Sequence, residues 1–178
     1  WDALILFDPP NVPLPGHRVY DLMDTFEHRL ADWALSRTDR FVAPAELAAD
    51  YMSTRAHSTW VEGAHELMAR AVLFEDQEGG DWRLKCPREL ESSIYLAAMT
   101  MNLWPNLDAF GGPVKLIAAD PEARRAPAPA FANRALAEDF GYDYEAIPET
   151  GHLLQIQNPE ACRRSMLSFL TDNGVVQQ

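Results

Sequence analysis

The chain has 178 residues, of which 47% are hydrophobic and 24% charged, as expected of a soluble globular protein with a real core. Its formal net charge of −12 argues against a nucleic-acid backbone or an anionic membrane surface as a partner, because both carry negative charge. The sequence contains no run of about 18 apolar residues, so no membrane span is expected.

The two cysteines, Cys86 and Cys162, lie far apart and match neither a zinc-binding nor a redox spacing. We interpret them as free, buried thiols in a reducing compartment rather than as a disulfide. Together with the absence of a signal peptide, this predicts a cytoplasmic protein.

The chain begins abruptly. After Trp1 and Asp2, residues 3–7 (ALILF) form a continuous apolar run, which is typical of a strand buried on both faces. Such a strand at the start of a sequence suggests a processed or truncated piece of a longer chain. The sequence Asp8-Pro9-Pro10 ends the strand, and a proline-rich loop continues to about Gly16.

From His17 to about Leu103, apolar residues recur at intervals of three and four, which predicts an almost wholly helical segment. The expected helices cover Val19 to Ala34, Glu46 to Arg55, a stretch capped by Ser58, and a stretch that begins at Pro87. Between the last two, residues 78–81 (EGGD) are expected to form a polar turn.

After Gly111-Gly112-Pro113 the pattern changes to alternating strands and helices. Strands are expected at Val114 to Ala118 and Tyr144 to Ile147, and helices at Pro129 to Phe140 and Pro159 to Leu170. This order predicts an α/β fold with a parallel sheet and right-handed crossovers. Three strands alone would leave such a sheet with an unpaired edge.

The most informative motif is the segment 147–152 (IPETGH), which ends in His152. A short apolar strand leads into a turn hinged on Gly151, and a helix that begins at Pro159 closes the segment. A histidine held on a loop between two rigid elements suits proton transfer, because its pKa lies near neutrality and its two ring nitrogens can face two partners.

In order and spacing, these features resemble the C-terminal half of an α/β-hydrolase. Residues 4–10 look like the strand that precedes the lid of that family, and residues 113–122 (PVKLIAADPE) look like the strand that follows the lid. Gly151-His152 and Asn158-Pro159-Glu160 resemble the family's histidine loop and last helix. The resemblance implies the C-terminal part of an α/β-hydrolase parallel sheet with an inserted helical lid. Its parts would be a core strand and loop (1–16), the lid (17–112), and core strands and helices with the acid and histidine (113–178).

The resemblance also implies site residues. None of the seven serines lies in the family's Gly-x-Ser-x-Gly nucleophile elbow, so the nucleophile is expected upstream of this chain. His152 would be the general base and acid. Its carboxylate partner would follow a strand, and Asp120 and Glu122 are the main candidates. Asp8 is a third candidate, since some members of the family place the acid after the earlier strand.

The implied activity is hydrolysis of an ester, amide, thioester or lactone through a Ser-His-Asp/Glu triad. No metal or cofactor is expected, and His57 and His65 form no HExxH motif. The expected partner is the N-terminal half of the same fold, as a separate or cleaved polypeptide. Alternatives on the same fold are an Asp-nucleophile epoxide or haloalkane hydrolase, a C–C bond hydrolase, or a non-catalytic binding protein. The substrate-binding residues remain unassigned.

Overall fold

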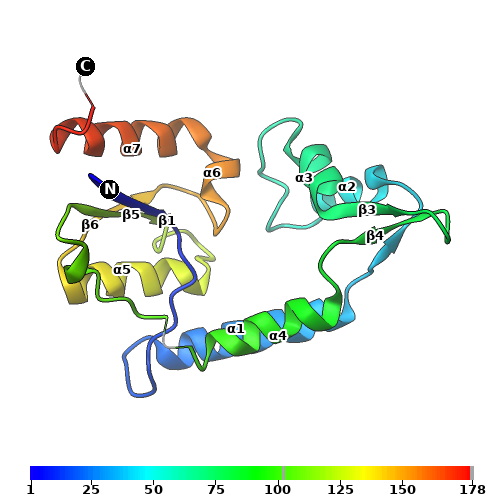
Figure 1. Cartoon of the computed structure of the whole chain (residues 1–178), viewed down its shortest axis with the longest axis horizontal. Coiled ribbons are helices and arrows are strands. Elements are labelled where there is room, and N and C mark those ends of the chain that lie inside the picture. The colour runs from blue at the N-terminus through cyan, green and yellow to red at the C-terminus, as the bar shows by residue number, and fades with distance from the viewer. Residues whose placement is uncertain (102, 177–178) are drawn as a thin grey trace. The chain divides into compact units, whose positions relative to one another are not determined.

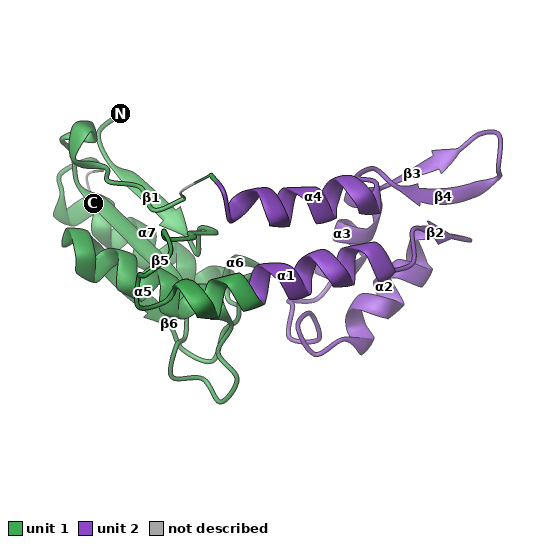
Figure 2. Ribbon diagram, turned by 90° about the horizontal axis from the view of Figure 1, so that it is seen from below, with its two compact units in different colours: residues 1–25, 101–178 green, residues 26–100 purple. Residues whose placement is uncertain are grey.

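The computed structural model (Figure 1) describes residues 1–101 and 103–176. The chain divides into two compact units, coloured separately in Figure 2. Unit 1 comprises Trp1–Thr25 and Met101–Gln178, and unit 2 comprises Phe26–Thr100. Both boundaries fall inside the segment 17–112 that the sequence predicts as a lid. Over the described part of the chain, no helix is both long and apolar enough to cross a membrane.

Unit 1 contains a three-stranded parallel sheet with the strand order β1-β5-β6. Its strands are β1 (Leu4–Phe7), β5 (Val114–Ala119) and β6 (Asp143–Ile147). Its remaining elements are the short 3-10 helix η1 (Asp108–Phe110) and the helices α5 (Ala128–Phe140), α6 (Leu154–Gln157) and α7 (Pro159–Asp172). The expected α/β fold with a parallel sheet is confirmed.

Helices cover both faces of this sheet, with α5 on one side and α7 on the other (Figure 1). Because successive side chains of a strand point to opposite faces, Leu116 packs with Leu136 of α5, whereas Ile117 lies in a cluster with Cys162 of α7. Every residue of the central strand β5 is buried. We expected β1 also to be buried on both faces, but its residues are only half-buried, since β1 lies at an edge of the sheet.

The helix α5 owes its close approach to the sheet to its small side chains. Five of its alanines are at most 7% exposed: Ala128, Ala130, Ala132, Ala135 and Ala137. The helix ends at Gly141, whose left-handed φ of 69° suits a glycine because a Cβ atom would be strained there. The chain then returns directly into β6.

Unit 2 contains helices and a second, antiparallel sheet. The helix α1 (Tyr20–Ser36) begins in unit 1 and continues into unit 2. The other elements are β2 (Arg40–Phe41), α2 (Pro44–Ser53), α3 (Ala64–Val72), β3 (Leu73–Asp76), β4 (Asp81–Leu84) and α4 (Arg88–Ala98). The strand order is β2-β4-β3, and the core contains Phe41, Leu47, Ala48, Ala69, Leu73 and Leu84.

The prediction of an almost wholly helical segment is therefore wrong between residues 73 and 84. The expected polar turn at 78–81 joins two strands as a hairpin, with Gly80 at a φ of 67°. The strand β3 follows α3 without a break, and its acidic residues hide the alternation of a strand. The ion pair between Arg83 and Asp76, 2.8 Å long, links the two strands. The predicted Ser58 cap is also wrong, since α3 begins at Ala64, after Gly63.

Candidate active site

Three strands of unit 1 end at the same edge of the parallel sheet, which is where α/β proteins bind ligands. Asp8 directly follows β1, Asp120 directly follows β5, and residues 148–152 follow β6. These segments carry the histidine and two of the three acids named from the sequence, Asp8 and Asp120, and Glu122 lies two residues after Asp120.

His152 pairs with Asp8 across 144 residues of sequence. Its Nδ1 lies 2.7 Å from Oδ2 of Asp8. The Asp8 side chain is 0% exposed, whereas the His152 side chain is 42% exposed. Since an ionised carboxylate only accepts hydrogen bonds, the contact fixes the proton on Nδ1 and leaves the lone pair of Nε2 for a reacting group.

Two N–H groups hold the other oxygen of Asp8. Oδ1 accepts a hydrogen bond from the backbone amide of Ala119 (3.0 Å) and one from Nδ2 of Asn133 (2.9 Å). The carboxylate thus faces three donors, which is the environment that a buried negative charge requires. The backbone of Asp8 has a φ of 41°, a left-handed conformation that aspartate adopts more readily than most residues.

Asp120 has a different set of partners, all of them backbone amides of nearby loops. Its Oδ1 accepts from the amide of Glu122 (2.9 Å) and its Oδ2 from the amide of Glu149 (3.0 Å). Its own amide donates to the carbonyl of Thr150 (3.3 Å). Asp120 therefore ties the end of β5 to the turn that carries His152, but its carboxylate does not contact the imidazole.

Glu122 has a partner outside the histidine site. Its Oε1 forms an ion pair with Nη1 of Arg134 at 2.8 Å, and its side chain is 79% exposed. Such a pair at the surface contributes little to stability. Of the three acids named from the sequence, the structure brings Asp8 to His152, whereas Asp120 and Glu122, the two favoured candidates, are engaged elsewhere.

The histidine loop is fixed by its own short-range hydrogen bonds. The amide of Gly151 donates to Oε1 of Gln157 in α6 (2.6 Å), and the hydroxyl of Thr150 donates to the carbonyl of Ile147 (2.7 Å). Thr150 itself is buried. These hydrogen bonds tie the loop that carries His152 to the end of β6 and to α6.

Sequence reasoning missed Asn133 and Asn11. The side chains of both are buried, and Nδ2 of Asn11 donates to Oδ1 of Asn133. One signal could have found Asn133: it is the single amide side chain in the alanine-rich helix at 128–140, where a polar residue needs a partner. Asn11 follows Asp8-Pro9-Pro10 and carries no comparable signal.

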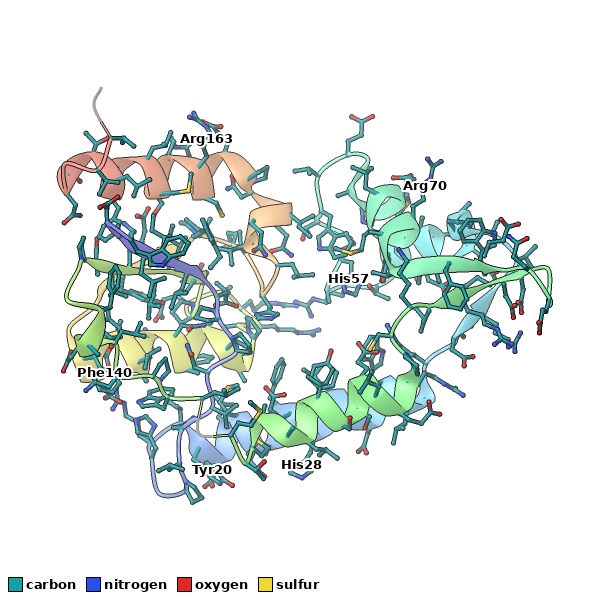
Figure 3. All side chains as sticks on the ribbon, in the orientation of Figure 1. Tyr20, His28, His57, Arg70, Phe140 and Arg163 are labelled. Carbon is teal, nitrogen blue, oxygen red and sulfur yellow. The ribbon has the colours of Figure 1, made fainter. Side chains whose placement is uncertain are left out.

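His57 and His65 belong to an aromatic cluster in unit 2. His57, labelled in Figure 3, contacts the rings of Tyr51 and Trp60, and Trp60 stacks on His65. Burial, and to a lesser extent the charge of His65, lowers the pKa of His57. These contacts are those of a packed core.

The arrangement around His152 can accept and return a proton, which is the role of a general base and acid. Among the described serines, Ser93, Ser165 and Ser168 hydrogen-bond to Leu90, Glu145 and Asp172 rather than to His152.

No protein-family model matches the chain, and no curated protein matches it in sequence. Solved structures do match. The peroxisomal α/β-hydrolase Lpx1 from Saccharomyces cerevisiae has a TM-score of 0.66 and 15% identity, over 98% of this chain and 47% of its own. E-2-(acetamidomethylene)succinate hydrolase has a TM-score of 0.63 and 15% sequence identity, over 95% of this chain and 57% of its own.

A thermophilic esterase from Thermogutta terrifontis gives a TM-score of 0.52 and 16% identity, over 96% of this chain and 56% of its own. The chain thus spans about half the length of the solved structures that it matches. At these identities the likeness shows the fold. The chain has the fold of part of an α/β-hydrolase.

Proposed function

We propose that this chain is the C-terminal part of a serine hydrolase and supplies the acid and the histidine of its catalytic triad. The observation that carries the proposal is the 2.7 Å hydrogen bond between the half-exposed His152 and the fully buried Asp8. A neutral imidazole whose Nδ1 proton is held by a buried carboxylate presents a basic Nε2.

In the proposed reaction, Nε2 of His152 takes the proton of a serine hydroxyl as that oxygen attacks a carbonyl carbon. The imidazolium then gives the proton to the leaving group, and an acyl-enzyme forms. In the second half-reaction His152 takes a proton from a water molecule as its oxygen attacks the acyl carbon, and gives that proton to the serine oxygen as the ester bond breaks and the acid is released. Asp8 would hold the ring in the productive tautomer and stabilise the imidazolium, a role we now assign to Asp8 in place of Asp120 or Glu122.

The substrate class we propose is an ester, thioester or amide. The names of the structural neighbours include an esterase, a thioesterase domain and the hydrolase of a succinate derivative. All such substrates share an acyl carbon that a serine can attack, which is the chemistry that the proton relay at His152 would serve.

The serine would come from the N-terminal half of the same fold, as a separate polypeptide or as part of a longer chain. Two observations support this partner. The strand β1 pairs with β5 along one edge, and no strand of the described residues pairs with its other edge. The neighbouring structures are also about twice as long as the matched region. An open strand edge of this kind is normally covered or paired.

The experiment that tests the function compares His152→Ala with the parent in the complete protein, meaning this chain together with the segment that supplies the remaining strands. On a panel of short aryl esters we expect kcat to fall by about 10⁴-fold or more, because removal of a triad member leaves only binding and oxyanion stabilisation. His28→Ala, an exposed histidine of α1, is the matched control and should retain activity. Unchanged turnover in His152→Ala would refute the proposal.

The partner has its own test. Residues 1–178 expressed alone should bind a hydrophobic dye and give a weak near-ultraviolet signal, because one sheet edge lacks its neighbour. Cooperative unfolding of the isolated chain would show that no partner is needed.

A further inference from the structure

Asn133 lies in the second turn of α5 and is 0% exposed. Buried alanines at positions 130, 132, 135 and 137 flank it along the helix, and their small side chains let α5 approach the sheet closely enough for this short side chain to reach the end of β1. A buried amide in an otherwise apolar face destabilises a fold unless its polar atoms are paired. At Asn133 both polar atoms are paired.

The hydrogen bonds of Asn133 fix which way its amide points. Nδ2 donates to Oδ1 of Asp8 at 2.9 Å and to the carbonyl of Pro9 at 3.2 Å. Oδ1 accepts from Nδ2 of Asn11, a residue 122 positions away in the sequence. A reversed amide would place two oxygens, those of Asn133 and Asp8, against each other and two NH₂ groups against each other. The network therefore permits one orientation.

The result is a directed series of hydrogen bonds in which Asn11 donates to Asn133 and Asn133 donates to Asp8. The imidazole of His152 donates to the same carboxylate from the opposite side. Since Oδ1 is held by Asn133 and by the amide of Ala119, the carboxylate cannot rotate about its Cβ–Cγ bond without breaking two hydrogen bonds. Oδ2 is thereby kept in line with His152.

We propose, on the basis of the proposed function above, that Asn133 is a positioning residue that holds the Asp8 carboxylate in the rotamer that orients His152. Asn133 touches no substrate and acts through Asp8. The backbone amide of Ala119 supplies one donor to Asp8, and Asn133 supplies the side-chain donor that fixes the plane of the carboxylate. Hydrogen bonds to charged groups of this kind are the stronger ones.

The test replaces Asn133 with two residues of similar size in the complete protein. Asn133→Leu removes both hydrogen-bonding atoms, and Asn133→Asp keeps the shape but replaces the Nδ2 donor with an oxygen. The first readout is the proton magnetic resonance signal of Nδ1–H of His152, which a hydrogen bond to a carboxylate moves far downfield. In both variants we expect this signal to shift upfield or broaden.

The second readout is steady-state hydrolysis of an aryl ester. We expect kcat to fall by about tenfold to a hundredfold with KM little changed, because a hydrogen bond to a charged group is lost but no contact with substrate is. Leu136→Val is the matched control, since it weakens the packing of the same buried helix without touching Asp8. It should lower Tm and leave both readouts unchanged.

A folded Asn133→Asp protein with the parent's Nδ1–H signal and kcat would overturn the proposal. If Asn133→Leu fails to fold, Asn133→Asp alone decides, because it preserves volume and shape. The magnetic resonance readout needs no turnover, so it tests the positioning role of Asn133 separately from the hydrolase function. Loss of the signal in a protein whose ester hydrolysis does not depend on His152 would support the positioning role and refute the hydrolase function.

Discussion

The ends of β1 and β5 each carry an aspartate directly after an apolar strand, yet the two carboxylates are used differently. Asp8 accepts from Ala119, Asn133 and His152, which lie between 111 and 144 residues away. Asp120 accepts from two backbone amides of adjacent turns. Asp8 is fully buried, whereas Asp120 is partly exposed.

The difference shows that the position of a carboxylate in the sequence does not decide its role. An oxygen that caps a backbone amide is already occupied and stabilises the loop that it closes. When groups from other elements hold one oxygen of a carboxylate in place, the second oxygen is directed toward a side chain from a further element. At the end of β1 that side chain is His152, so Asp120 hydrogen-bonds within the loops and Asp8 hydrogen-bonds to the histidine.

The largest expected effect separates the two aspartates directly. Asp8→Asn should lower kcat for ester hydrolysis by about 10³–10⁴-fold, because an amide at this position favours the wrong imidazole tautomer and cannot stabilise the imidazolium. Asp120→Asn should lower kcat by less than about tenfold, since it acts through the geometry of the loop. Equal losses of kcat in Asp8→Asn and Asp120→Asn, measured at saturating substrate, would contradict the different roles of the two carboxylates.

Asp139, like Asp8, is a carboxylate whose partners lie far away in the sequence, but we assign it a structural role. Asp139 in α5 accepts hydrogen bonds from His17 (2.9 Å), Arg18 (2.6 Å) and Trp104 (3.0 Å). Burial raises its pKa, but these hydrogen bonds outweigh burial and hold the pKa below the ordinary value of 3.8. Asp139→Asn should destabilise the fold by about 1–3 kcal/mol and leave kcat unchanged.

The depressed pKa of Asp139 also predicts a pH dependence. A carboxyl with a lower pKa in the folded state contributes stability that is fully present above its unfolded pKa and is lost as the pH falls through its folded pKa. The difference in the free energy of unfolding between the parent and Asp139→Asn should therefore shrink below about pH 4. A difference that stays constant down to the lowest pH would contradict this assignment.

The smallest expected effect concerns the turn that Asp120 holds. Glu149 has a φ of 60°, and its amide donates to Asp120. Glu149→Gly keeps that amide and relieves the left-handed strain, so we expect a gain of about 0.5–1 kcal/mol after the entropy of glycine is subtracted. Thermal unfolding would measure it, with Glu149→Ala as the control that keeps the strain.

The parallel sheet was predictable from the sequence because each strand ends at a charged or proline residue and because β1 and β5 are short, largely apolar runs. The residues 114–119 and 143–147 form strands almost as expected. The hairpin at 73–84 was not predictable from periodicity, since β3 continues directly from a helix and carries Glu75 and Asp76. Its pairing depends on cross-strand contacts that only the folded chain brings together.

His152 could be named as a candidate site residue from the sequence because its glycine hinge and flanking elements are local features. Its carboxylate partner could not be read in this way, since the choice among Asp8, Asp120 and Glu122 depends on the direction of side chains that follow two separate strands, β1 and β5. Burial and long-range donors distinguish them, and neither can be read from one sequence. Asn133 stands out as the single amide in its alanine-rich helix, but its partner could not be read from the sequence, because Asp8 lies 125 residues away.

We propose that Asp8 and His152 act as one catalytic unit, and a double-mutant cycle on kcat measures whether they do. Because residues that act as a unit are strongly non-additive, adding Asp8→Asn to His152→Ala should cause no further loss of ester hydrolysis. Asp120→Asn, added to the His152→Ala background, should lower kcat further by its own small factor. If Asp8→Asn lowers kcat by the same factor in the His152→Ala background as in the parent, the two residues act independently and do not form a catalytic unit.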